Sequence, residues 1–214
     1  VMKKLAFFIL LSLVTLGVSA QSNLKWNVNA GIGMSNWYGD DTDGTDAKFA
    51  YKVGIGLEVP FANTNIWSFQ TGLNFISKGV KGDGVTDAWD VVDVTINQLY
   101  LELPINVQFR FNIANNTNLV VATGPYLACG VGGKAKFDGE ASIGNVGINA
   151  DEKIDTFGDD GLGYNRFDAG WNIGLGVEFG QILVGLDTQL GFCKIMDGNA
   201  PHNANIGITV GYKF

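Results

Sequence analysis

The sequence predicts an all-β fold, an eight-stranded antiparallel up-and-down transmembrane β-barrel. Three observations lead to this prediction. Eight segments alternate large apolar residues with small or polar ones, which is the period of a strand whose two faces meet different surroundings. Short turns and longer polar loops connect these segments in alternation, as in barrels of the outer membrane. A segment with the pattern of an export signal precedes the first of them.

The amino-terminal segment, residues 1–20, has the pattern of a cleaved signal peptide. Two lysines open it, an apolar run follows over residues 5–16, and small residues precede Gln21. The run is shorter than the about 20 apolar residues that cross a bilayer, so a cleaved signal is favoured over a retained anchor. We therefore expect residues 1–20 to be removed after export and residues 21–214 to form one barrel domain.

The composition limits the classes of function. Without the two signal lysines, the chain carries 12 basic and 21 acidic residues, a net charge of −9. Acidic proteins of this kind bind nucleic acid poorly, so no nucleic-acid partner is expected. Two cysteines, Cys129 and Cys193, are too few for a disulfide scaffold.

The predicted strands are, in chain order, 24–37, 48–60, 66–78, 92–111, 118–134, 164–179, 181–195 and 203–214. Their large apolar residues occupy alternate positions and therefore share one face. In order, this face contains Trp26, Val28 and Ile32; Phe49, Val53 and Ile55; Trp67, Phe69 and Leu73; Leu101, Ile105 and Phe109; Leu119, Leu127 and Val131; Phe167, Trp171 and Ile173; Ile182, Leu186 and Phe192; Ile206, Ile208, Tyr212 and Phe214. The fifth strand has the weakest pattern of the eight.

The connections between strands differ in length. Residues 60–65, residues 112–117 and Gly180 form tight turns rich in Asn, Gly and Pro. The other connections, residues 38–47, 79–91, 135–163 and 196–202, are longer and polar and are predicted to be loops. Short turns at one end and long loops at the other fit a membrane barrel.

The same alternation could belong to a soluble barrel with its apolar face inward. Two features favour the membrane barrel. The polar faces are rich in glycine and poor in lysine and glutamate, which suits a crowded interior better than a solvated surface. Aromatic residues also gather near both strand ends of the apolar face, as in the girdles at the two bilayer interfaces. The loop-end girdle is predicted to contain Trp37, Phe49, Tyr51, Phe75, Phe167 and Phe192.

The opposite face predicts a charged interior. An eight-stranded barrel is just wide enough for side chains to fill it, so no open pore is expected. Ten charged residues, five of each sign, point inward by parity: Lys25, Lys52, Glu58, Glu102, Arg110, Arg166, Asp168, Glu178, Asp187 and Lys213. Buried charges persist when they are paired, so a salt-bridged network that fills the lumen is favoured. A selective proton or ion path is the alternative.

The other 16 acidic residues fall in or next to the four predicted loops, which makes that end of the barrel strongly negative. Asp41, Asp43 and Asp46, with Gly44, are spaced like the opening of a calcium loop. No glutamate follows at the closing position, so a solvated acidic loop is favoured over a calcium site. No other cofactor is expected.

His202 is the one histidine, and it lies in the last predicted loop close to Asp197. No serine or cysteine nucleophile is near it in sequence, and a loop histidine is usually solvated. The protein is therefore predicted not to be an enzyme, and a surface enzyme that uses His202 remains the least favoured alternative.

Several segments together carry a family resemblance. They are Y-L-E-L-P-I-N-V-Q-F-R at residues 100–110, G-P-Y at 124–126, F-D-A-G-W-N-I-G-L-G-V-E-F at 167–179 and the terminal G-Y-K-F. Over essentially the whole mature chain, the sequence resembles the PorT-like outer-membrane barrel family of Bacteroidetes. The resemblance implies insertion into the cell outer membrane by the outer-membrane assembly machinery, which would recognise Tyr212 and Phe214. It does not imply one activity.

The combined expectation is a monomeric structural or interaction barrel at the cell surface. Its partners would be outer-membrane lipid, lipopolysaccharide and an unknown protein that meets the acidic loops. A small porin-like barrel that transports ions or solutes is the alternative.

Overall fold

We describe a computed structural model of the chain. It covers residues 24–40, 42, 44–61, 66–86, 89–143, 146–158 and 161–214, without the side chains of residues 83–93 and 137–152. The predicted signal peptide, residues 1–20, lies outside this description and stays a prediction. Within the described part of the chain, no helix has the length and apolarity to cross a membrane.

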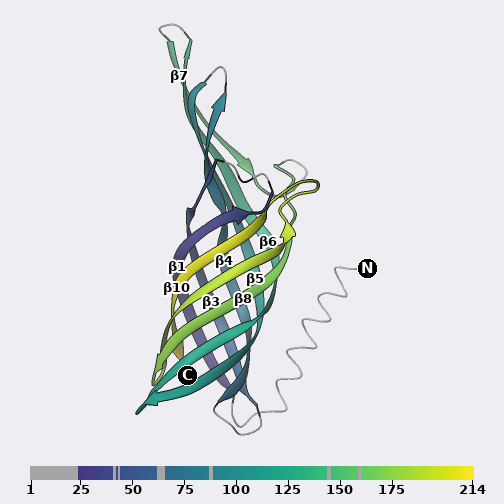
Figure 1. Cartoon of the computed structure of the whole chain (residues 1–214). Coiled ribbons are helices and arrows are strands. Elements are labelled where there is room, and N and C mark those ends of the chain that lie inside the picture. The colour runs from purple at the N-terminus through teal and green to yellow at the C-terminus, as the bar shows by residue number, and fades with distance from the viewer. Residues whose placement is uncertain are drawn as a thin grey trace.

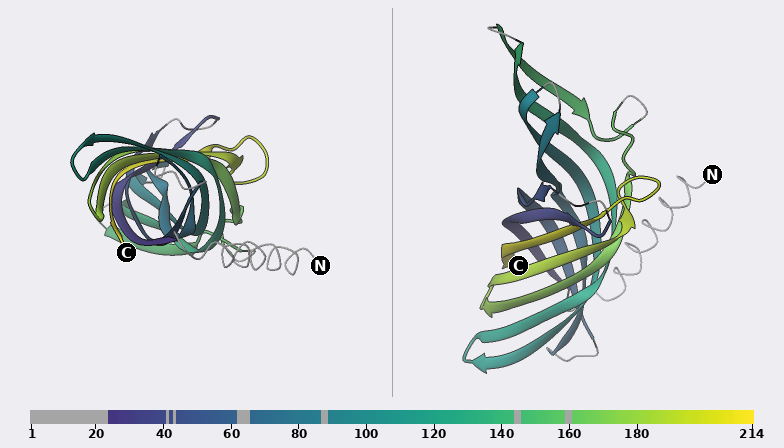
Figure 2. Two further views of the ribbon diagram at one scale, coloured as in Figure 1. Left: turned by 90° about the horizontal axis from the view of Figure 1, so that it is seen from below. Right: turned by 45° about the horizontal axis from the view of Figure 1, so that its top comes forward.

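The described residues form ten strands: β1 (Lys25–Tyr38), β2 (Thr45–Asp46), β3 (Lys48–Pro60), β4 (Trp67–Thr86), β5 (Trp89–Ala114), β6 (Thr117–Ile143), β7 (Val146–Asp155), β8 (Phe167–Phe179), β9 (Ile182–Lys194) and β10 (His202–Lys213). Eight of them form a closed antiparallel barrel in the order β4-β3-β1-β10-β9-β8-β6-β5, and β5 pairs again with β4. The ring is visible from below in Figure 2, and Figure 1 shows its tilted strands. The predicted eight-stranded antiparallel barrel is confirmed.

The first and last strands of the barrel form its seam. β1 and β10 are paired from Asn27 opposite Lys213 to Tyr38 opposite His202. This pairing gives both strands a neighbour on each side, so the barrel wall has no open edge. The seam therefore joins residues that are far apart in the sequence.

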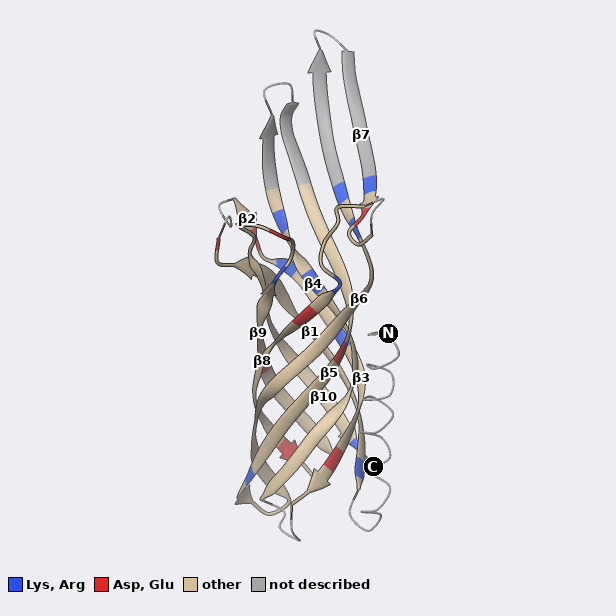
Figure 3. Cartoon of the chain, turned by 90° about the vertical axis from the view of Figure 1, so that its right-hand side faces the viewer, with Lys and Arg blue, Asp and Glu red and all other residues tan. Residues whose placement is uncertain are grey.

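The outer wall is apolar, as the alternation predicts. Trp26, Ile32, Phe49, Ile173 and Phe192 each leave more than half of their surface exposed, although they are among the largest apolar residues in the chain. Charged positions are sparse over the barrel strands and more frequent above them in Figure 3. A continuous apolar band of this size is unfavourable in water and is the normal outer surface of a barrel in lipid.

Trp37 is an exception to the predicted aromatic girdle. It packs inside the loop end of the barrel, edge-on to Tyr164, with 6.1 Å between ring centroids. The reason is parity, since Trp37 lies two residues after the fully buried Ser35 and so faces the interior. The prediction that Trp37 faces lipid is wrong.

Two of the predicted loops are largely strands. β4 and β5 continue their ladder past the barrel to Thr86 opposite Trp89, and β6 continues to pair with β7 from Lys134 opposite Asp155. β2 adds a short pairing to β4. Figure 1 shows this extension rising above the loop end of the barrel. The prediction of loops at 79–91 and 135–163 is therefore wrong. These segments are polar because the strands have left the apolar surroundings, and the strands remain paired there.

Glycines in the wall make room for amide side chains. Gly54 and Asn74 are register partners on β3 and β4, and the amide of Asn74 lies directly over Gly54. Gly56 has the same relation to Asn27 of β1, whose Oδ1 is 2.5 Å from the place a Cβ would occupy. Interior glycine therefore lets polar side chains lie flat against the neighbouring strand.

We expect Gly54→Ala to lower the free energy of unfolding by about 1–3 kcal/mol, because overpacking displaces side chains and backbone. The new Cβ would overlap Asn74 Oδ1 and lie 2.9 Å from the Leu73 carbonyl oxygen. Urea unfolding in lipid vesicles, followed by tryptophan fluorescence, measures the change.

Gly174→Ala is the matched control, since the nearest atom to its Cβ, Ala122 Cβ, is 3.6 Å away. It should leave the unfolding free energy unchanged or raise it by less than about 1 kcal/mol. Equal losses in both variants would contradict this account of the wall glycines.

Candidate functional site

The lumen is divided into layers along the barrel axis. At the turn end lies the basal quartet, which consists of Glu58, Arg110, Glu178 and Lys213. The central cluster of Lys78, Glu102 and Asp168 lies nearer the loop end. A polar chamber separates these two ion clusters, and an aromatic and aliphatic cap covers the central cluster. The candidate site is this stack.

The basal quartet joins four strands of the barrel. Arg110 of β5 donates from Nη2 to Glu58 Oε2 of β3 at 2.6 Å and from Nε to Glu178 Oε2 of β8 at 3.1 Å. Lys213 of β10 lies 3.0 Å from Glu58 Oε2 and also pairs with Glu178. All four side chains are at least nine-tenths buried. Two cations and two carboxylates therefore neutralise each other across the turn end.

The central cluster is organised by Lys78, the last residue of the predicted strand 66–78, which is not among the ten predicted lumen charges. Its Nζ lies 2.9 Å from Asp168 Oδ2 and 3.7 Å from Glu102 Oε2, and no more than 2% of any of the three side chains is exposed. The ammonium also lies 4.1 Å from the ring centroid of Tyr126, whose hydroxyl donates to Asp168 at 3.2 Å. The predicted set of lumen charges is incomplete without Lys78, because β4 continues beyond this residue and Lys78 has the same parity as Asn74 and Ile76.

Lys48, the first residue of the predicted strand 48–60, is a second interior lysine that is not among the ten predicted lumen charges. It is buried, and its Nζ donates to Ser77 Oγ at 2.8 Å and to the Lys78 carbonyl oxygen at 3.3 Å. Lys48 and Lys78 are therefore interior cations that the predicted set of ten lumen charges does not contain. The alternation of the predicted strands would have placed both lysines inside. Lys48 has the same parity as Lys52, and Lys78 has the same parity as Asn74.

Two of the predicted network residues belong to none of the interior ion pairs among the described residues. Arg166 precedes β8, donates from Nη1 to the Gly130 carbonyl oxygen at 3.0 Å and lies 5.4 Å from the Phe157 ring centroid. Lys25 is half-buried at the start of β1, opposite Glu58 in register, and no ion pair of Lys25 is found within the described residues. These two side chains are therefore not part of the paired network.

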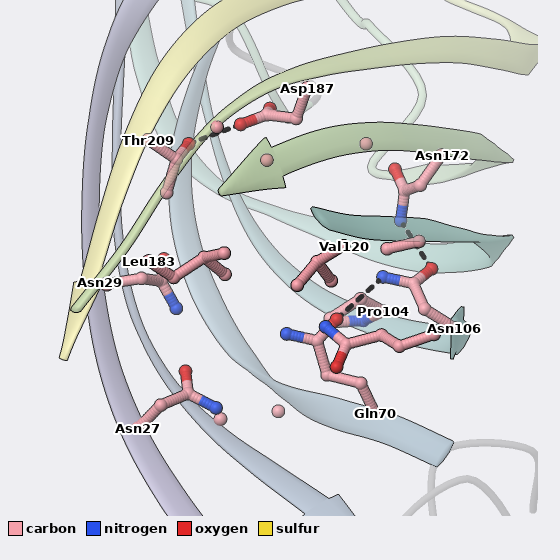
Figure 4. A pocket seen from close by; sticks show the side chains of 18 of the residues that line it. Asn27, Asn29, Gln70, Pro104, Asn106, Val120, Asn172, Leu183, Asp187 and Thr209 are labelled. Carbon is pink, nitrogen blue, oxygen red and sulfur yellow. Dashed lines mark hydrogen bonds between the residues drawn. The ribbon is translucent and has the colours of Figure 1, made fainter. Parts of the chain in front are cut away.

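The chamber between the clusters has a volume of about 130 Å³. Amide side chains dominate its wall: Asn27, Asn29, Gln70, Asn74, Asn106, Gln108 and Asn172. Figure 4 shows several of them converging, with Asn172 donating to Asn106 at 3.5 Å and Asn106 donating to Gln70 at 3.4 Å. The Oδ1 atoms of Asn29 and Asn172 are buried and have no hydrogen-bond partner among the residues that the structure describes.

One ion pair belongs to the chamber wall. Lys52 Nζ lies 2.8 Å from Asp187 Oδ1, and Thr209 donates to the same carboxylate. The side chains of Lys52 and Asp187 are 14% and 26% exposed, more than those of either ion cluster. Lys52 and Asp187 were both predicted to belong to the lumen network. Because they pair with each other, their charges are neutralised in the chamber wall.

The cap closes the loop end. Phe157 meets Tyr100 edge-on with 5.4 Å between ring centroids, and Tyr164, Ile195 and Trp37 pack into the same cluster. Burial raises the pKa of the Tyr164 hydroxyl to about 12. The backbone N–H of Tyr164 donates to the Thr156 carbonyl oxygen at 3.1 Å. This hydrogen bond connects the two ends of the segment between β7 and β8.

The predicted calcium residues are only partly described. Asp41 and Asp43 lie outside the described residues, and Asp46 is exposed on β2 opposite Lys81 of β4. No group of three or more metal-ligating side chains occurs in the part of the chain that the structure describes. Calcium at this loop stays a prediction.

His202 is the first residue of β10 and not a loop residue. Its ring lies 5.4 Å from that of Tyr38, whose hydroxyl donates to the Gly191 carbonyl oxygen at 2.5 Å. Among the described residues, no ion pair joins His202 to the exposed Asp197. The histidine therefore packs at the seam of the barrel.

The terminal aromatic residues lie on the outer face at the turn end. Tyr212 and Phe214 are 41% and 68% exposed, and their rings meet edge-on with 5.2 Å between centroids. The backbone N–H of Phe214 donates to the Trp26 carbonyl oxygen at 2.8 Å. Both rings are therefore available to surrounding lipid.

Comparisons with known proteins agree with this architecture. The family model described as outer membrane protein beta-barrel domain matches residues 14–197. No curated protein matches the chain.

Three solved structures are similar. The attachment invasion locus protein Ail of Yersinia pestis is 16% identical, with 90% of this chain and 99% of that chain covered and a TM-score of 0.41. Neisserial surface protein A is 10% identical, with 88% and 97% covered and a TM-score of 0.42. The translocator domain of autotransporter NalP from Neisseria meningitidis is 12% identical, with 98% and 96% covered and a TM-score of 0.27.

We expect Lys78→Met to lower the free energy of unfolding by about 3–5 kcal/mol, because it leaves Glu102 and Asp168 buried without their cation. The comparison variant is Lys52→Met, which removes the cation of a pair that is partly open to the chamber. Its cost should be about 1 kcal/mol. Urea unfolding of both variants in the same lipid measures the difference, and equal costs would contradict the central role of Lys78.

Proposed function

The chain belongs to the outer membrane protein beta-barrel domain family, and from this membership we propose that the barrel is a closed anchor that presents a binding surface outside the cell. The observation that carries the proposal is the contrast between the two parts of the molecule. The lumen is blocked by two clusters of paired charges, whereas the strands of the extension leave the lipid-facing wall and project beyond it.

The extension has the properties of a rigid support for a surface. β4, β5, β6 and β7 share one continuous ladder there, so the projecting backbone is held by hydrogen bonds to the barrel itself. Described carboxylates at this end, at Asp40, Asp46, Asp155 and Asp197, are exposed, and two of them already pair with lysines, Asp40 with Lys194 at 3.9 Å and Asp155 with Lys134 at 3.4 Å. A partner with basic groups, or divalent cations shared with the phosphates of lipopolysaccharide, fits the other two, Asp46 and Asp197.

The finer assignments form part of the same proposal. The motifs at residues 100–110 and 167–179 support membership of the PorT-like group of Bacteroidetes. Export by a signal peptide cleaved after Ala20, assembly guided by Tyr212 and Phe214, a monomeric state and the absence of enzymatic activity complete it. Calcium at Asp41, Asp43 and Asp46 would act as a cation bridge at this surface.

Transport through the barrel is the less favoured function. An ion that crosses the lumen would have to displace both the basal quartet and the central cluster, and the carboxylates of both clusters already have cationic partners. Breaking such buried pairs is costly.

We expect trypsin, added to intact cells, to cut the protein within residues 134–153, where Lys134, Lys136 and Lys153 are exposed. The barrel fragments should stay in the outer membrane fraction. Gel electrophoresis of that fraction, followed by mass spectrometry, identifies the sites. Cleavage that requires broken cells would place the extension on the inner side of the membrane and would end the surface proposal.

Addition of a chelator before chymotrypsin, which cuts after aromatic residues, tests the cation bridge. Faster cleavage after Tyr38, at the start of residues 38–47, would support it, and an Asp46→Asn variant should remove the difference. An unchanged rate would reject calcium at this loop.

We expect Phe214→Ala to reduce the amount of protein that shows heat-modifiable gel mobility in the outer membrane. Phe192→Ala is the matched control, because Phe192 is a lipid-facing aromatic residue of similar exposure, 62% against 68%, away from the chain end. If both variants lose the same amount, Phe214 contributes only lipid contact and does not act as an assembly signal.

A further inference from the structure

The chamber is sealed unequally at its two ends. Toward the loop end, the central cluster lies above it with 0–2% exposure, and the cap of Phe157, Tyr164 and Ile195 lies above that. Toward the turn end, the basal quartet is the one ionic layer, and its side chains retain up to 9% exposure. Access from the turn end therefore has to disturb fewer contacts.

The position of the basal quartet in its strands points the same way. Glu178 is the residue before the last of β8, and Lys213 is the last residue of β10. Strand ends open locally at lower cost than strand centres. Lys78, Glu102 and Asp168 belong to strands that continue, or connect to packed loops, beyond the cluster. A transient opening therefore occurs first at the basal quartet.

The wall chemistry selects an uncharged occupant. Each amide side chain offers both a donor and an acceptor, and the free Oδ1 atoms of Asn29 and Asn172 accept hydrogen bonds from whatever fills the space. The charges of Lys52 and Asp187 neutralise each other at 2.8 Å. An ion would lose its hydration without gaining a countercharge, whereas a neutral polar molecule exchanges water contacts for amide contacts.

We propose that the chamber is a binding compartment for small, uncharged, hydrogen-bonding molecules, which enter from the turn end when the basal quartet opens and do not pass the central cluster. A volume of about 130 Å³ holds several water molecules or one solute of a few heavy atoms. The proposal does not depend on the surface role of the extension. It concerns the opposite end of the barrel.

Reporter cysteines on β6 test access to the two layers. The first reporter is Ala122→Cys, at a residue that lines the chamber. The second is Ala128→Cys, at a residue that also faces the interior but is 4% exposed and pairs in register with Glu102 and Asp168 of the central cluster. Both are placed in a Cys129→Ser, Cys193→Ser background of the full chain in lipid vesicles. The probe is methyl methanethiosulfonate, a small neutral thiol reagent. We expect labelling at residue 122 and none at residue 128 in the same time.

Two isosteric substitutions identify the route. Glu178→Gln weakens the basal quartet and should speed labelling of Ala122→Cys about ten-fold, since one charged partner of Arg110 and Lys213 is lost. Glu102→Gln weakens the central cluster by an equivalent change and should leave that rate unaltered. A trimethylammonium-bearing reagent should label residue 122 at least about ten-fold more slowly than the neutral one, after each rate is divided by that at the exposed Asp197→Cys.

Three results would overturn the proposal. The first is that Ala122→Cys is not labelled even when Glu178→Gln is present. The second is that Glu102→Gln speeds the labelling of Ala122→Cys more than Glu178→Gln does. The third is that the neutral and the cationic reagent label Ala122→Cys at equal normalised rates. Heat-modifiable gel mobility verifies that each variant is folded. If Glu178→Gln fails this control, Lys213→Gln replaces it, because Lys213 pairs with both carboxylates of the basal quartet, Glu58 and Glu178.

Discussion

The closed hydrogen-bonded ladder is the constraint on which the rest of the structure depends. In lipid, a backbone N–H or carbonyl group without a partner costs several kcal/mol, so a sheet can cross only when it has no edge. The pairing of β1 with β10 and of β4 with β5 removes the edges of this sheet. Alternation then follows, since every second side chain must face lipid and the rest must share a narrow interior.

The narrow interior explains the kinds of residue found there. The carboxylates of the two ion clusters are at least nine-tenths buried, so each needs a cation from another strand, and Arg110 serves two of them. Glycines at Gly54 and Gly56 allow neighbouring amides to lie against the wall. Where glycines and short side chains are most frequent, the filling is incomplete and the chamber remains. The ion clusters and the chamber are therefore two outcomes of the same spatial limit.

Period-two alternation predicted the wall of the barrel from the sequence because membrane strands repeat one rule over 12 or more residues. It also placed Glu58, Arg110, Glu178 and Lys213 inside, and these residues meet. It missed interior residues at the ends of the predicted strands. Lys78 ends the predicted strand 66–78 and was left out of the lumen, although one further step of parity past Ile76 includes it.

Other features could not follow from alternation alone. The register between strands decides which interior charges meet, and register depends on pairings across the whole barrel. The pairing of β6 with β7 above the barrel is of this kind, because residues 135–163 have no lipid-facing pattern. The chamber depends on side-chain volumes summed over eight strands, which no single segment contains.

The β1–β10 seam has a consequence for the order in which the protein is built. Asn27 and Lys213 are separated by almost the whole barrel sequence, so their contact is among the slowest to form by loop closure. Until β10 docks, Glu58 and Glu178 have only Arg110 as a buried cation, and the turn end is short of one positive charge. Docking of the final strand closes the cylinder and balances that charge in one event. Completion of the wall and neutralisation of its base are thus coupled, and an assembly intermediate is distinguished from the finished barrel by its electrostatics as well as by its shape.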